Sequence, residues 1–226
     1  MFDTIVFDLD GTILNTLADI RNAVNYTLCC YGLKTASEDD IRHYVGSGLK
    51  NAIKSALADK GGLSLAEKET EKALLILISY YSKNAANLTE PYKGIESLLM
   101  KLVSRGIKVC VLTNKDESIA KALVMTFFPS VRFSFVRGKR PSSALKPDRA
   151  LTLEVLSNIE SKAERTIIVG DSDVDYMTAL NAGAYPIIVS YGYKSEAELR
   201  KIGVKKTIKS VAELEKEIEK VAKVML

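Results

Sequence analysis

"TIVFDLDGTILNT", residues 4–16, begins as an apolar, β-branched run and then breaks into two aspartates on either side of a leucine. Asp8 and Asp10 are followed at once by Gly11, a residue that favours a tight turn. Two like charges this close cost free energy unless a cation offsets them. The stretch therefore predicts a buried strand that ends in a turn with a cationic partner.

The rest of the chain repeats this strand-then-helix pattern. Apolar, β-branched runs predict further strands at about 108–113, 131–136, 165–170 and 185–190, and helical patterns lie between them at about 95–105, 117–127, 148–158 and 174–182. Strands that alternate with helices imply right-handed crossovers and a parallel sheet covered on both faces. The predicted fold class is α/β, with a doubly wound, Rossmann-like parallel sheet.

One connection is much longer than a crossover, which needs only about a dozen residues. Between the first two strands, helical patterns occur at 16–31, 38–45, 49–59 and 65–83, and Ser37 with Asp40 and Ser64 with Glu67 resemble capping boxes. We therefore predict an α/β catalytic core of residues 1–14 and 92–226 and an inserted all-helical cap domain of residues 15–91. Because ligands bind beyond the carboxyl ends of the strands, an insertion that leaves from there is expected to act as a lid.

Polar side chains follow the predicted strands where each one ends. The collected set is Asp8, Asp10, Thr113, Asn114, Lys146, Asp171 and Asp175. In the predicted topology these residues converge on one edge of the sheet. Carboxylates gathered at one point make an oxygen-rich site that suits Mg²⁺, so the predicted cation is magnesium.

Each of these features also has an ordinary structural explanation. Asp-Gly is a common turn pair, threonine is common at strand ends, and a lone lysine is usually solvated. "GDSDVD", residues 170–175, could simply be the capped start of a helix. The joint arrangement in one chain favours a site over four separate coincidences.

Composition excludes several other classes of protein. The chain has 226 residues, of which 47% are apolar and 27% charged, and its net charge is +4, which is ordinary for a soluble globular protein. It has neither a targeting segment nor an apolar run long enough to cross a bilayer, so we expect a cytoplasmic protein without a membrane partner. The basic cluster "RGKR" at 137–140 is interpreted as a solvated loop rather than a nucleic-acid contact, and the three cysteines as reduced core residues.

The motifs "DLDGT", "LTNK", "LKPD" and "GDSDVD" occur in one order and at spacings that resemble the haloacid dehalogenase superfamily of phosphohydrolases. The resemblance covers nearly the whole chain. Within the superfamily the sequence looks most like the phosphoglycolate phosphatase branch, because of the helical insertion after the first motif, "YVGSGLKNAI" inside it, and "TNK" at residues 113–115. This resemblance implies a Mg²⁺-dependent phosphatase of a small phosphorylated metabolite, with phosphoglycolate as a candidate.

The resemblance also implies a role for each residue of the set. Asp8 would be the nucleophile that becomes phosphorylated, and Asp10 the acid and base that protonates the leaving group and later activates water. Thr113, Asn114 and Lys146 would bind the phosphate. Asp8, Asp171 and the carbonyl of Asp10 would hold the metal, with Asp175 supporting it through water or Lys146.

Two alternatives to a phosphatase remain open from the sequence. A sugar-phosphate mutase of the β-phosphoglucomutase kind has the same cap and motifs but returns the phosphoryl group to its intermediate. A receiver-like, non-enzymatic magnesium switch also uses aspartates, a threonine and a lysine, but such domains are shorter and carry the phosphorylated aspartate after the third strand. Arg42, His43 and Lys50 are candidates to meet a substrate carboxylate, and the alternative is that they are exposed or core residues of the cap.

Overall fold

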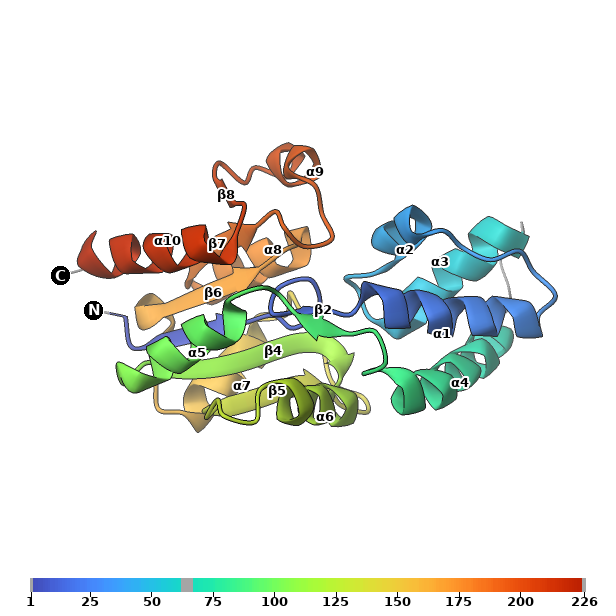
Figure 1. The fold of residues 1–226 in the computed structure, drawn as a ribbon, viewed down its shortest axis with the longest axis horizontal. Helices are drawn as coiled ribbons and strands as arrows, with labels where there is room; N and C mark the ends of the chain where they lie inside the picture. Colours follow the sequence, from blue (N-terminus) through green and yellow to red (C-terminus); the bar gives the residue numbers. More distant parts are fainter. Residues whose placement is uncertain (1, 62–66, 225–226) are drawn as a thin grey trace. The chain divides into compact units, whose positions relative to one another are not determined.

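The computed structural model describes residues 2–61 and 67–224 and contains a six-stranded sheet in the order β5–β4–β1–β6–β7–β8 (Figure 1). The bounds are β1 Thr4–Phe7, β4 Lys108–Asp116, β5 Phe135–Lys139, β6 Thr166–Gly170, β7 Tyr185–Val189 and β8 Thr207–Ile208. Every neighbouring pair is parallel. The predicted doubly wound parallel sheet is confirmed, and its strand order changes direction beside β1.

Helices cover both faces of this sheet. On one face Val6, Cys110 and Ile168 pack with apolar residues of α7 (Arg149–Asn158) and α8 (Asp173–Ala182). Side chains alternate along a strand, so the neighbouring residues Ile5 and Val109 point to the opposite face. Helices α5 (Ile95–Ser104) and α10 (Val211–Val224) pack together there, in front of the sheet in Figure 1.

The predicted strand at 131–136 was placed too early, because β5 begins at Phe135. Val131 and Phe133 alternate as in a strand, but the ring of Phe133 packs against the end of the preceding helix instead: the rings of Phe128 and Phe133 meet edge to face with centroids 6.0 Å apart. The 3-10 turn at Ala163–Arg165 (η1), helix α9 (Glu196–Lys201), strand β8 and helix α10 were not predicted. Helix α6 (Glu117–Phe127) has the predicted bounds.

Between β2 (Leu14–Asn15) and β3 (Glu90–Pro91), the described residues of the inserted segment form four helices. These are α1 (Leu17–Cys30), α2 (Glu38–Tyr44), α3 (Leu49–Gly61) and α4 (Glu67–Asn84). The capping box predicted at Ser37 and Asp40 is present, whereas Ser64 lies outside the described residues. Buried Asp19 of α1 accepts hydrogen bonds from the backbone N–H of Leu88 and Thr89, so its carboxylate fixes the segment that leaves α4.

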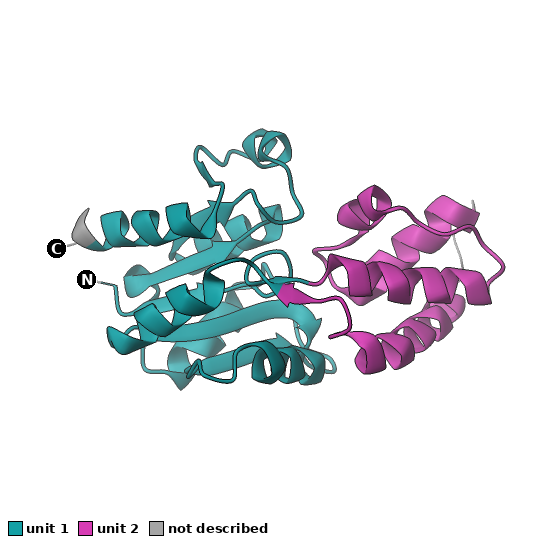
Figure 2. Cartoon of the chain, viewed as in Figure 1, with its two compact units in different colours: residues 1–15, 91–226 teal, residues 16–90 magenta. Residues whose placement is uncertain are grey.

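The described residues divide into two compact units, coloured separately in Figure 2. One comprises residues 1–15 and 91–226 and contains the sheet, and the other comprises residues 16–90. The chain crosses from one unit to the other twice, near residues 15 and 90. The strands at these two crossings, β2 and β3, pair with each other in a two-stranded sheet.

The structure corrects the interpretation of two features of the sequence, the cysteines and the basic cluster at 137–140. Cys29 and Cys30 are exposed at the end of α1, so only Cys110 of the three cysteines is a core residue as expected. The cluster "RGKR" is not a free basic patch, because Arg137 and Arg140 form ion pairs with Glu154 of α7 and lie within 4 Å of Glu117. Within residues 2–61 and 67–224, no helix combines the length and apolar character needed to cross a membrane.

Candidate active site

Asp8 lies immediately after β1 and is buried. The ammonium nitrogen of Lys146, which comes from the loop between β5 and α7, lies 2.6 Å from Asp8 Oδ1 and 2.6 Å from Asp175 Oδ1. Asp175 belongs to the first turn of α8, where its other oxygen accepts from the hydroxyl and N–H of Ser172 in a capping box. One buried lysine thus bridges carboxylates that follow two neighbouring strands, β1 and β6.

Asp171 completes a cluster of three buried carboxylates. It follows β6 directly, and its Oδ2 accepts a hydrogen bond of 2.7 Å from the backbone N–H of Tyr193. Asp8, Asp171 and Asp175 each offer an oxygen, and the three oxygens lie within 4.8 Å of one another. The sequence placed these residues at one edge of the sheet, and the structure brings them together with Lys146.

The electrostatics of this cluster favour a further cation. Burial raises the pKa of Asp8 to about 7, although Lys146 acts in the opposite direction. Burial, reinforced by the charges of Asp175 and Asp8, also raises the pKa of Asp171 well above its usual range. Burial alone would lower the pKa of Lys146, but the neighbouring carboxylates outweigh it and raise that pKa. A single lysine cannot balance three carboxylates, and oxygen donors of this kind suit a hard divalent cation.

Asp10 faces a different partner. Its two carboxylate oxygens lie 2.8 and 2.7 Å from the ammonium nitrogen of Lys115, whose side chain is only 1% exposed. The carboxylate of Asp10 is therefore not a member of the cluster that Asp8, Asp171 and Asp175 form. The two aspartates of the first motif are each paired with a separate buried lysine, and Lys115, the last residue of "TNK", is a partner that the sequence did not predict.

Thr113 and Asn114 lie near the carboxyl end of β4 and are both buried. The hydroxyl oxygen of Thr113 accepts from the N–H of Lys115 at 3.3 Å. The side-chain amide of Asn114 makes two bonds with the backbone of Lys146: its oxygen accepts from Lys146 N–H at 2.8 Å, and its nitrogen donates to the Lys146 carbonyl at 3.3 Å. Asn114 thus holds the backbone from which the bridging lysine extends.

Sequence reasoning missed the loop that follows β7, residues 190–194. A Cβ added to Gly192 would lie 2.3 Å from the carbonyl oxygen of Gly11 and 2.5 Å from the Cβ of Asp171, so only glycine fits there. Next to it, Tyr191 donates from its hydroxyl to the Thr12 carbonyl at 3.0 Å. The glycine between two tyrosines in "SYGYK" was the signal available in the sequence, because such a glycine often marks a close backbone approach.

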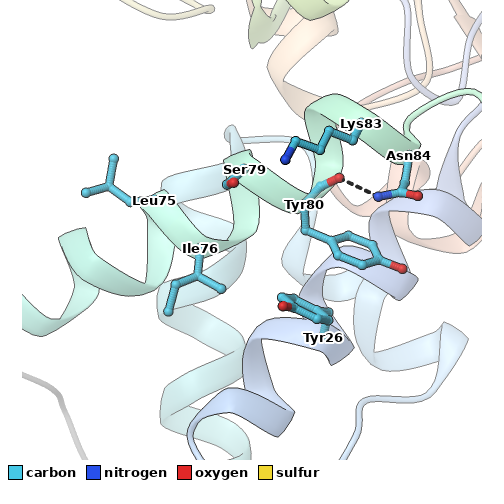
Figure 3. Close-up of a pocket in the computed structure, with 7 residues that line it drawn as sticks. All are labelled: Tyr26, Leu75, Ile76, Ser79, Tyr80, Lys83 and Asn84. Atoms are coloured by element: carbon cyan, nitrogen blue, oxygen red, sulfur yellow. Dashed lines mark hydrogen bonds between the residues drawn. The ribbon is translucent and has the colours of Figure 1, made fainter.

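The candidate specificity residues of the helical unit all have local partners. Arg42 pairs with Glu38, Lys50 pairs with Glu67, and the His43 ring lies against the Asp39 carbonyl. The same unit has an open pocket of about 450 Å³ along α4, where the rings of Tyr26 and Tyr80 stack with centroids 4.4 Å apart (Figure 3). No residue of the predicted site lines that pocket.

Comparison with known proteins identifies the family of the chain. Residues 5–189 match the family model of the haloacid dehalogenase-like hydrolases. The chain belongs to this family. A phosphoglycolate phosphatase of Agrobacterium fabrum is 32% identical over 188 residues, which cover 83% of this chain and 80% of that protein. A phosphoglycolate phosphatase of Aquifex aeolicus is 30% identical over 189 residues, covering 84% and 85% of the two chains.

Solved structures of this hydrolase family have the same architecture. The crystal structure of a candidate phosphoglycolate phosphatase from Lactobacillus delbrueckii subsp. bulgaricus superimposes with a TM-score of 0.91 at 28% identity, covering 96% of this chain and 98% of that chain. A predicted phosphoglycolate phosphatase from Haemophilus somnus gives a TM-score of 0.87 at 25% identity, with the same coverage. Membership of the haloacid dehalogenase-like hydrolases, on the branch that includes phosphoglycolate phosphatases, is therefore supported by sequence and by fold.

Proposed function

We propose that this protein is a Mg²⁺-dependent phosphatase that hydrolyses a small phosphate monoester through an aspartyl phosphate on Asp8. The observation that carries the proposal is the buried group of Asp8, Asp171 and Asp175 around Lys146. Three carboxylates beside one lysine leave negative charge to be offset before a phosphate dianion can approach. Membership of the hydrolase family indicates the class of reaction, which is hydrolysis. The buried group provides the side chains that could carry it out.

The donor set fits magnesium. Asp8 and Asp171 are the carboxylates we assign to the metal, with the carbonyl of Asp10 as the third protein ligand that the family resemblance implies. Asp175 is already engaged by Lys146 and Ser172, so we assign it the task of holding Lys146. When bound, Mg²⁺ would supply charge neutralisation for the carboxylates and the substrate phosphate.

In the first half of the proposed reaction, an oxygen of Asp8 attacks phosphorus and the bond from phosphorus to the leaving oxygen breaks. Asp10 enters this half in its protonated form, which the second half regenerates, and gives that proton to the leaving oxygen, so the alcohol leaves neutral. Lys146, which lies 2.6 Å from Asp8, is placed to bind an oxygen of the transferring phosphoryl group, and Thr113 and the backbone around Asn114 are assigned to the other oxygens. The product of this half is a phosphorylated Asp8.

In the second half, water attacks the phosphorus atom while Asp10, now a carboxylate, takes its proton. The bond from phosphorus to Asp8 breaks, inorganic phosphate leaves, and Asp8 is regenerated. Two carboxylates with separate environments suit this division of labour. Asp8 is enclosed, whereas the side chain of Asp10 is 20% exposed and can meet the leaving group and water.

Phosphoglycolate is the substrate we favour, because both curated relatives described above are phosphoglycolate phosphatases. The test is a panel of phosphorylated metabolites incubated with purified protein, in Mg²⁺ and in excess chelator, with release of inorganic phosphate as the readout. We expect phosphate release that requires Mg²⁺ and is fastest with phosphoglycolate. Conversion of glucose 1-phosphate derivatives to another phosphorylated sugar, without phosphate release, would instead support the mutase alternative.

A further inference from the structure

Lys115 is a buried lysine that has no assigned role in the proposed reaction. It lies near the carboxyl end of β4, and its ammonium nitrogen contacts both carboxylate oxygens of Asp10, at 2.8 and 2.7 Å. The exposed fractions of the two side chains differ, at 1% for Lys115 and 20% for Asp10. The lysine is therefore enclosed by protein, whereas the side chain of Asp10 keeps some contact with solvent.

The backbone around Lys115 is built for a close approach. The register between β4 and β5 shifts between Leu112 and Asp116, so the strand is irregular where Lys115 lies. A Cβ added to Gly138 of β5 would lie 2.7 Å from the Lys115 carbonyl oxygen and 2.5 Å from the Cα of Glu117. A strand irregularity of this kind re-aims side chains, and the tight contact with Gly138 holds it in place.

A long lysine side chain loses rotamer freedom when it is buried, and its charge must also be desolvated. The ion pair with Asp10 offsets these costs and fixes both oxygens of a carboxylate on a turn. Proton transfer requires the donor to lie within hydrogen-bond reach of the reacting oxygen, so a fixed carboxylate is catalytically useful.

We propose that Lys115 is a positioning residue that holds the Asp10 carboxylate in the orientation from which it exchanges protons with the leaving group and with water. The inference rests on the proposed function, since it assigns Lys115 a task within that reaction. Lys146 serves the nucleophile Asp8, and Lys115 serves the proton carrier Asp10. Lys115 itself acts only through Asp10.

This role makes a prediction about leaving groups. Phenyl phosphate releases a poor leaving group that needs protonation, whereas 4-nitrophenyl phosphate releases a stabilised phenolate that needs little. Removing Lys115 should therefore slow phosphorylation of the enzyme by phenyl phosphate by about 10- to 100-fold, which is less than the roughly 100- to 10,000-fold expected for loss of the general acid itself, and slow phosphorylation by 4-nitrophenyl phosphate much less. A lysine that merely stabilises the fold would slow both reactions by the same factor.

The experiment measures the rate of phosphoenzyme formation by rapid quenching for wild type, Lys115→Met, Asp10→Asn and the double variant. Lys121→Met is the matched control, because Lys121 is an exposed lysine of α6 that pairs with Glu117. Thermal melting in Mg²⁺ establishes that each variant is folded at the assay temperature. We expect the leaving-group effect in Lys115→Met, none in Lys121→Met, and no further loss when Lys115→Met is added to Asp10→Asn.

The possible failures can be told apart. A wild type that neither forms a phosphoenzyme nor releases phosphate from either ester in Mg²⁺ contradicts the proposed function, and the role of Lys115 with it. A wild type that is active, together with a Lys115→Met variant slowed equally on both esters or slowed further in the Asp10→Asn background, contradicts the positioning role alone.

Discussion

Lys146 places its ammonium nitrogen 2.6 Å from Oδ1 of Asp8, the carboxylate that ends β1. The two residues are far apart in the sequence, and the side chain of Lys146 is only 4% exposed. A buried cation in direct contact with the proposed nucleophile compensates charge in the resting protein and is available to the substrate phosphate during the reaction.

Replacement of Lys146 should therefore affect both stability and activity. We expect Lys146→Met to lower kcat by roughly 100- to 1,000-fold, as for loss of one preorganised charge-stabilising group. In excess chelator it should also lower the free energy of unfolding by about 3–5 kcal/mol, because Asp8 and Asp175 would remain buried without their partner. Steady-state kinetics and urea unfolding measure the two effects. Lys205→Met, a change of an exposed lysine, is the control and should alter neither.

The raised pKa of Asp8 predicts how stability depends on pH in the absence of metal. Its folded pKa, about 7, exceeds the ordinary value of 3.8, so the folded state retains the proton more strongly than the unfolded state. The contribution of Asp8 to stability is therefore fully present below pH 4 and is lost as pH rises toward 7. Asp8→Asn has no ionisable carboxyl group at this position, so it should not lose stability in this way as pH rises.

The comparison is thus between wild type and Asp8→Asn in chelator at pH 5 and pH 8. We expect the variant to be the more stable protein, by a margin that grows from pH 5 to pH 8. Mg²⁺ should stabilise wild type more at pH 8 than at pH 5, because protons compete with metal for the carboxylates. Asp173→Asn, a change of the exposed aspartate between Asp171 and Asp175, should follow wild type throughout. A pH-independent margin would contradict the assigned environment of Asp8.

Gly192 should be needed for metal binding through its contact with Asp171. Any Cβ there would lie 2.5 Å from Oδ2 of Asp171, the oxygen that accepts from Tyr193 N–H. We expect Gly192→Ala to displace this carboxylate and raise the Mg²⁺ concentration needed for half-maximal activity by about tenfold or more, as for residues that orient metal ligands. Gly61→Ala, a helical change with only side-chain atoms of Leu33 nearby, is the control. An unchanged Mg²⁺ requirement would show that the loop does not orient Asp171.

The sheet-containing unit should fold without the helical unit. Every residue assigned to the reaction lies in residues 1–15 or 91–226, and β2 and β3 pair where the chain passes between the units, so a short linker can replace residues 17–88. We expect the shortened protein to unfold cooperatively and to hydrolyse 4-nitrophenyl phosphate in Mg²⁺. Loss of preference among small phosphate esters would support the assignment of residues 16–90 as a cap that selects the substrate, whereas an unchanged ranking of substrates would contradict it.

The parts of the fold that were predictable are those with strong local patterns. Strand β1 and helix α6 have clear periodicity and well-marked ends, and the carboxyl ends of parallel strands bring Asp8 and Asp171 to one edge of the sheet. The partner of Asp10 was not predictable, because it depends on the register shift of β4 that aims Lys115 inward. The approach of Gly192 to Gly11 depends likewise on tertiary packing between distant loops.

Helices α9 and α10, which were not predicted, do have local signals in the sequence. Ser195 and Glu198 form a capping box at the start of α9, and the apolar positions Val211, Leu214 and Ile218 recur at helical spacing along α10. The late start of β5 is different, because Val131 and Phe133 alternate as strand residues do, and the contact of Phe133 with Phe128 arises only in the folded protein. Local periodicity therefore predicts that a strand lies in this region but does not fix the residue at which it begins.

The central claim is that Asp8 is the nucleophile and Asp10 the proton carrier, although only Leu9 separates them. The most direct test incubates Asp8→Asn and Asp10→Asn with 4-nitrophenyl phosphate and Mg²⁺, quenches rapidly and measures intact mass. We predict that Asp10→Asn gains one phosphoryl group and loses it slowly, with turnover lowered on the order of 100- to 10,000-fold, and that Asp8→Asn gains none. A phosphoryl adduct on Asp8→Asn and none on Asp10→Asn would reverse the two roles and contradict the mechanism.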